Sequence, residues 1–192
     1  MENTNKISQY EKIIEASYTC LSEKGYANVS LREIASEAGV ALSQLHYYFG
    51  SKKELFKAIV QKMVVDFLQL VESQFKNANE PMERISFLIE LQETIRQNKL
   101  GLYRIIWDFT SLALWSDPFR EVMNGFYKDL TELTEKYIID DDFITDRIKG
   151  YDDKDIARMI LGSILGVGIQ QLMDTDNEEI GKSLNTIKLI LK

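Results

Sequence analysis

Apolar residues recur with a helical period along nearly the whole chain, and this pattern constrains the fold more than any other feature. In the first periodic segment, for example, Tyr10, Ile13, Ser17 and Cys20 share one side of a helix. No run of alternating β-branched residues interrupts this pattern. Two prolines and ten glycines in 192 residues are too few for a turn-rich β-sandwich. The sequence therefore predicts an all-α protein.

Capping signals divide the chain into about nine helices. Ser30 and Glu33 form one capping box, Ser51 and Glu54 form a second, and Gly25 has the conformational freedom to end the first helix. We expect helices over residues 7–24, 30–39, 42–48, 52–77, 81–98, 100–115, from 117 to an acidic loop at 140–153, 155–173 and 178–191.

Composition and charge exclude several classes of function. The chain has one cysteine, Cys20, and one histidine, His46, so we expect no disulfide framework, no metal site, no cofactor and no enzyme built on a nucleophile–histidine pair. The net charge is −7 but it is unevenly spread. Residues 1–60 carry seven Lys or Arg and seven Glu, whereas residues 61–192 carry 16 basic against 23 acidic side chains. A neutral first third and an acidic remainder predict two parts with different partners.

The polar N-terminus lacks the pattern of a signal peptide. The most apolar window, Met159 to Ile169, is about half the ~20 residues that a membrane span requires. We therefore expect a cytoplasmic protein that has no membrane partner.

The stretch from Ile34 to Phe49 has the layout of a helix-turn-helix motif. Two short helices meet at Gly39, and their apolar residues, with those of the first helix, form one small core. With Leu45 buried, the outward side of the second helix carries Leu42, Gln44, His46 and Tyr47. A glutamine amide pairs with adenine edges, a leucine contacts a thymine methyl, and Lys52 at the next helix start is suited to a phosphate.

Residues 7–60 resemble the DNA-binding domain of the TetR/AcrR family of bacterial transcriptional regulators. The residues that carry the resemblance are Ile13-Ile14-x-Ala16, Gly25-Tyr26, Ser30, Ile34-Ala35-x-x-Ala38-Gly39-Val40 and Leu45-x-x-Tyr48-Phe49-x-Ser51-Lys52-x-x-Leu55. The resemblance implies a helix-turn-helix three-helix domain (residues 1–50) and a larger helical ligand-binding and dimerisation domain (residues 51–192). It also implies a homodimeric repressor that binds a palindromic DNA operator and is released by an unknown small apolar or amphipathic effector.

The resemblance assigns DNA contacts to Ser30, Arg32, Leu42, Gln44, Tyr47 and Lys52. Two positions depart from the family pattern, because Ala41 replaces the usual serine and His46 the usual tyrosine. Ala41 has no hydroxyl for a cap or a phosphate, while His46 either donates to a phosphate or is merely solvated. The alternative function is therefore a helical small-molecule-binding or interaction module whose DNA-reading head is vestigial.

Two sets of residues in the second domain have both a functional and a plain structural interpretation. The aromatic residues Phe87, Tyr103, Trp107 and Phe126 either line an apolar ligand pocket or fill the core. Arg104 and Asp108, one helical turn apart, predict an exposed ion pair. Small and aliphatic residues at helical spacing predict a dimer interface, the alternative being an intramolecular core; they are Gly162, Gly166, Ile169, Ile180, Leu184, Ile187 and Leu191.

Overall fold

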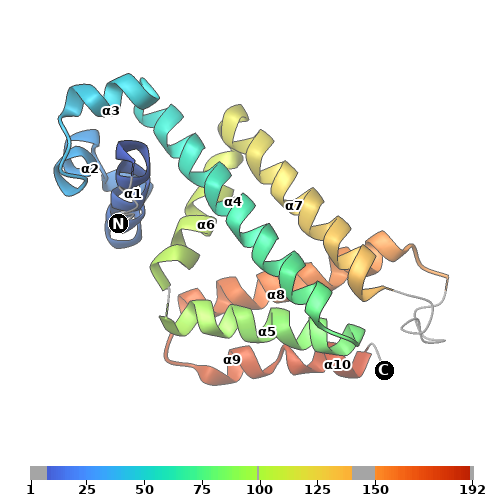
Figure 1. Cartoon of the computed structure of the whole chain (residues 1–192). Coiled ribbons are helices and arrows are strands. Elements are labelled where there is room, and N and C mark those ends of the chain that lie inside the picture. Colours follow the sequence, from blue (N-terminus) through green and yellow to red (C-terminus); the bar gives the residue numbers. More distant parts are fainter. Residues whose placement is uncertain (1–7, 99, 140–149, 191–192) are drawn as a thin grey trace, which may run out of the picture. The chain divides into compact units, whose positions relative to one another are not determined.

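A computed structural model describes residues 8–98, 100–139 and 150–190 of the chain (Figure 1). These residues form helices and no strands, which confirms the predicted all-α class. The helices are α1 (Gln9–Asn28), α2 (Leu31–Glu37), α3 (Leu42–Phe49), α4 (Lys52–Asn77), α5 (Pro81–Asn98), α6 (Leu100–Ala113), α7 (Asp117–Ile138), α8 (Asp153–Met173), α9 (Glu178–Lys182) and α10 (Asn185–Ile190). Most of the predicted acidic loop lies outside the described residues.

The chain folds into two compact units that do not follow the predicted boundary at residue 50. The first unit comprises residues 1–63 and 101–122, and the second comprises residues 64–100 and 123–192, so that α4 and α7 contribute to both. The first unit includes residues 101–113 of α6 and the start of α7, where the ring of Tyr26, at the end of α1, packs edge-on against Phe109 of α6 and Phe119 of α7, at centroid distances of 5.8 and 6.1 Å. Contacts between residues this far apart in sequence are not visible in a local pattern.

Glycine and serine set the ends of the short helices in the first unit. Gly25 has φ 70° and ψ 166°, a conformation almost confined to glycine, and it breaks the helical backbone of α1 where the sequence predicts. Ser8 caps the start of α1 and Ser30 the start of α2, each in a capping box with a glutamate three residues on. Ile13, Leu21, Ile34 and Leu45 fill the core between these helices. Cys20 is also buried there, and burial raises the pKa of its thiol.

Arg84 joins two helix ends in the second unit. Its guanidinium donates to the carbonyls of Phe75 and Ala78 at the end of α4, at 2.9 and 2.6 Å, and to the carbonyl of Tyr137 at the end of α7, at 2.6 Å. The last carbonyls of a helix generally lack a donor within that helix, and one side chain here binds carbonyls at two helix ends. The ring of Phe75 packs beside it against Phe87 and Tyr137.

The prediction of one continuous helix over residues 178–191 is wrong, because α9 ends at Lys182 and α10 begins at Asn185. Two hydroxyls compete for backbone carbonyls at the break: Ser183 donates to Ile180, and Thr186 donates to Ser183. Gly181 also brings α9 very close to α8, since a Cβ at this position would lie 2.4 Å from Nε2 of Gln171. Residues 191 and 192 lie outside the described residues.

Candidate nucleic-acid interface

The turn between α2 and α3 holds these helices as a helix-turn-helix. Gly39 has φ 64°, and the N–H of Val40 donates to the carbonyl of Ala35 at 3.0 Å, which closes the turn. Ile34 and Leu45 are fully buried where the two helices meet. The buried side of α3 is thereby fixed, and its opposite side is left open.

The exposed side of α3 carries the side chains that the sequence assigns to DNA. Tyr47 is 85% exposed, His46 is exposed, and Leu42 and Gln44 are half-buried. The rings of Tyr10 and Tyr48, which were not predicted as site residues, extend this face: Tyr48 lies edge-on to Tyr47 at 5.5 Å and to Tyr10 at 6.5 Å. Half-exposed tyrosines are amphipathic, so they contact sugars and phosphates as readily as protein.

Gln44 is already engaged within the protein. Its Oε1 accepts the backbone N–H of Ala41 at 3.1 Å, and its Nε2 donates to Oε1 of Gln9 at 3.2 Å. The first bond takes over part of the capping role, because Ala41 caps α3 without a side-chain hydrogen bond. A bidentate bond to an adenine uses both the oxygen and the nitrogen of the Gln44 amide, so both present partners would have to be released. The free protein therefore holds this amide in an arrangement that differs from the DNA-bound one.

His46 makes a hydrogen bond that fixes how its ring can act. Nδ1 lies 2.9 Å from the carbonyl of Gly50, which only accepts, so Nδ1 carries the proton of the neutral ring. Nε2 is then an acceptor in the neutral ring and a donor only in the imidazolium form. A neutral His46 therefore suits an amino group on a base edge, while a phosphate contact requires the protonated ring.

Ser30 and Glu33 form a charged cap at the start of α2. Oε2 of Glu33 accepts from both the N–H and the hydroxyl of Ser30 at 2.8 Å, and Oε1 accepts from Lys24 at 2.7 Å. The hydrogen bond from Lys24, followed by those from Ser30, lowers the pKa of Glu33 to about 2. The same contact raises the pKa of Lys24. Arg32 is exposed beside this cap, whereas the hydroxyl of Ser30 is already bonded to Glu33.

The two lysines that begin α4 differ in their surroundings. The ammonium of Lys52 donates to the carbonyl of Tyr26 at 3.0 Å and lies 5.0 Å from the ring centroid of Tyr26 and 5.5 Å from that of Phe56. Its side chain is half-buried, whereas Lys53 is exposed. The lysine predicted to bind a phosphate thus has its charged group bonded inside the first unit.

The four aromatic residues predicted to line a ligand pocket fall into different parts of the chain. Phe87 and Phe126 belong to the second unit, Phe87 half-buried and Phe126 buried against Phe67 at 5.7 Å. Trp107 is half-buried in the first unit, and the side chain of Tyr103 lies outside the described part of the structure. Asp108, predicted to pair with Arg104, accepts the backbone N–H of Tyr26 through Oδ2 at 3.2 Å.

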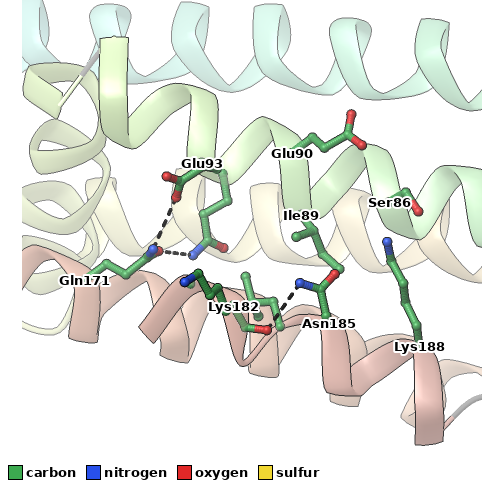
Figure 2. A pocket seen from close by; sticks show the side chains of 11 residues that line it. Ser86, Ile89, Glu90, Glu93, Gln171, Lys182, Asn185 and Lys188 are labelled. Atoms are coloured by element: carbon green, nitrogen blue, oxygen red, sulfur yellow. Dashed lines mark hydrogen bonds between the residues drawn. The ribbon is translucent and has the colours of Figure 1, made fainter. Parts of the chain in front are cut away.

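A cavity of about 300 Å³ opens instead among α5, α8, α9 and α10 (Figure 2). Both charged and apolar residues line it: Glu90 and Glu93 come from α5, Lys182 and Lys188 from the two last helices, and Ile89 and Leu184 are apolar. The amide groups of Gln92 and Gln171 form a hydrogen-bonded pair 2.9 Å apart, and both side chains are at least 95% buried. A second hollow of about 600 Å³ shares Ser86 and Glu90 with the first and includes Phe87.

The predicted dimer residues also separate into buried and exposed sets. Leu184 and Ile187 are buried within the second unit, 2% and 6% exposed, so they serve its own core. Ile180 is half-buried, and Leu191 lies outside the described residues. On α8, one stripe at spacings of three and four stays open, half-buried at its centre and exposed elsewhere; its members are Met159, Gly162, Gly166, Ile169 and Met173.

By length and composition α8 is apolar enough to cross a membrane, yet only 39% of its most apolar window is buried. A core helix of a soluble protein has the same composition, so this property gives no evidence of a membrane. Among the described residues no group of three or more His, Cys, Asp or Glu side chains is arranged to hold a metal ion.

Comparison with known proteins shows that residues 13–59 match the bacterial regulatory proteins of the tetR family. The chain is 30% identical over 86 residues to the HTH-type transcriptional regulator BetI of Brucella canis. This match covers 45% of the chain and 43% of BetI, so the chain spans less than half the length of that relative.

Solved structures match over nearly the whole chain. A TetR transcription regulator from Haloarcula marismortui superposes with a TM-score of 0.77 and 25% identity, covering 95% of this chain and 96% of that one. The regulator FadR from Bacillus subtilis, solved with stearoyl-CoA, superposes with a TM-score of 0.75 and 20% identity, covering 95% and 98%. The second similarity is one of fold alone.

Proposed function

The chain belongs to the TetR family of bacterial transcriptional regulators, and we propose that it is a DNA-binding repressor released from a palindromic operator by a small molecule. The observation that carries this proposal is the open side of α3, the helix that follows the Gly39 turn, on which Tyr47 and His46 are exposed. A second helix held in this way enters the major groove with its outward side chains toward the base edges. The protein is on this account a cytoplasmic regulator and not an enzyme.

The open stripe on α8 supports a homodimer. An apolar face that includes Met159, Ile169 and Met173 is covered in a stable soluble protein, and glycines at 162 and 166 allow a second helix to approach closely. A dimer joined here would carry two copies of α3, the reading helix. These two helices must lie about 34–36 Å apart, or a multiple of that, to meet successive major grooves.

The effector is proposed to bind in the second unit. The cavity among α5, α8, α9 and α10 combines an apolar floor at Ile89 and Leu184 with charged walls, which suits a small amphipathic molecule better than a purely apolar one. FadR, which shares the fold, was solved with the amphipathic stearoyl-CoA. Binding releases the operator if the effector prefers the dimer conformation whose reading helices do not fit the duplex.

Selection of bound fragments from genomic DNA tests the proposal. The full-length protein is expected to enrich fragments that share an inverted repeat, and Gln44→Ala to change the bases preferred in each half-site. The alternative is a binding module whose helix-turn-helix no longer reads DNA. Two observations favour it: Ala41 provides no side-chain cap for α3, and Gln44 is bonded to Gln9 within the protein. That alternative predicts no enriched sequence with either protein.

A further inference from the structure

The start of α4 is attached to the end of α1 by a bond that the sequence did not reveal. The ammonium of Lys52 lies against the carbonyl oxygen of Tyr26 at 3.0 Å and faces the rings of Tyr26 and Phe56. A carbonyl and two aromatic faces together stabilise a partly desolvated cation. All three contacts would be lost if the side chain of Lys52 rotated away from Tyr26 to reach a phosphate.

The peptide of Tyr26 is held from its other side as well. Its N–H donates to Oδ2 of Asp108, and its ring packs against Phe109 and Phe119. Tyr26 directly follows Gly25, where the helical backbone of α1 breaks. Lys52 therefore binds a segment whose position is already fixed by α6.

Lys52 lies close to the end of α3 in the sequence, so its bond to Tyr26 also affects the position of α3. Only Gly50 and Ser51 separate Lys52 from Phe49, the last residue of α3. Fixing the ammonium on Tyr26 thus fixes the C-terminal end of α3 relative to α1. The next residue, Lys53, lies in the same first turn of α4 and its side chain is exposed.

We propose that Lys52 is a positioning residue for the reading helix, and that Lys53 is the lysine that meets a phosphate at the start of α4. This inference rests on the proposed DNA-binding function. It differs from the prediction made from the sequence, in which Lys52 itself binds the phosphate.

The salt dependence of binding separates the two roles. Each phosphate contact releases counterions, so losing one lowers the slope of log affinity against log salt by about one unit. A residue that only positions α3 changes the affinity without changing this slope. The experiment measures the slope of log affinity against log salt for the wild type, Lys52→Met and Lys53→Met, on a duplex selected by the full-length protein. Methionine is chosen because it removes the charge and keeps most of the aliphatic side chain.

We expect Lys53→Met to lower the slope by about one unit for each bound protomer. Lys52→Met is expected to weaken binding by about tenfold at every salt concentration, the factor that corresponds to one charge-assisted hydrogen bond, and to keep the wild-type slope. A lower slope for Lys52→Met overturns the inference, and so does an unchanged slope for Lys53→Met. Lys52→Arg is expected to restore the affinity, because its guanidinium also donates to a carbonyl and stacks on rings.

A second measurement uses the wild-type protein and does not depend on the folding of a variant. Acetylation of lysines, read by mass spectrometry, is expected to modify Lys53 readily in the free protein and to be blocked there by the duplex. Lys52 is expected to react slowly with or without DNA. Fast acetylation of Lys52 that DNA abolishes would overturn the inference. A wild-type protein that selects no duplex at all overturns the proposed function instead, while slow acetylation of Lys52 in the free protein still supports its internal bond.

Discussion

The backbone N–H of Tyr26 donates to Oδ2 of Asp108, a residue 82 positions further along the chain, at 3.2 Å. This bond joins the break in α1 to α6 and brings residues 101–122 into the same compact unit as the reading helix. The carboxylate also lies 3.0 Å from the point where a side chain at Gly25 would begin. The geometry around Tyr26 therefore limits which residues can occupy position 25.

Gly25→Ala is expected to destabilise the protein by about 1–3 kcal/mol, because φ 70° and ψ 166° are strained for any residue with a Cβ. Chemical denaturation followed by circular dichroism measures the change. Gly125→Ala in α7 is the matched control, since nothing lies within 4 Å of an added Cβ there, and it is expected to gain up to about 1 kcal/mol. Equal stability of Gly25→Ala and the wild type would contradict the assigned backbone.

Glu33→Gln is expected to change how stability depends on pH. The folded-state pKa of Glu33, about 2, lies below the unfolded value near 4.5, so its contribution is present above pH 4.5 and is lost as the pH falls toward 2. The variant should therefore melt below the wild type at pH 6, and the gap should close as the pH falls from 4.5 to 2. Thermal melts at several pH values measure this gap. A gap of the same size at pH 6 and pH 2.5 would count against the Lys24–Glu33–Ser30 network.

Ala41→Ser is expected to stabilise the protein by about 0.5–2 kcal/mol. A serine hydroxyl at this position can accept a backbone N–H of the first turn of α3, whereas Ala41 makes no side-chain hydrogen bond as the N-cap. Denaturation midpoints measure the gain. Ala41→Val lacks the hydroxyl and serves as the control that should show no gain. If both variants change stability equally, the effect comes from side-chain volume and the cap is not the cause.

Ile169→Glu is expected to abolish the proposed dimer. The substitution places a charge in the middle of the open stripe on α8, where a partner would desolvate it. Sedimentation velocity should give a dimer for the wild type and a monomer for the variant. Gln170→Glu, on the neighbouring exposed position, should leave the dimer intact. A monomeric wild type would contradict this interface.

Local sequence patterns predicted the parts of the structure that depend on local interactions. The cap formed by Ser30 and Glu33 and the break at Gly25 follow from residue types within a few positions of each other. The same reasoning missed the break between α9 and α10, where Gly181 packs against the distant Gln171. It also assigned Lys52 to a DNA phosphate and did not reveal its internal bond, because the carbonyl that binds its ammonium lies 26 residues before it in the chain.

In the candidate site, too, the features set by neighbouring residues were predictable and those set by distant residues were not. The outward direction of Tyr47 and His46 follows from the burial of Leu45, which the apolar pattern revealed. The bond between Gln44 and Gln9 joins residues 35 positions apart, and no local pattern indicates it. The partial exposure of Tyr10 was not predicted, because Tyr10 shares one side of α1 with the buried Ile13 and Ser17.

The most direct test of the account is whether the open side of α3 discriminates between DNA sequences. Fluorescence anisotropy measures how tightly two proteins bind DNA: the wild type and a double variant that carries both Gln44→Ala and Tyr47→Ala. Each protein is tested on a selected duplex and on a scrambled duplex at one salt concentration. The account predicts that the wild type prefers the selected duplex by at least about 10³ and that the double variant loses most of this preference but keeps its affinity for the scrambled duplex. A double variant that retains the full preference would show that α3 does not read the sequence.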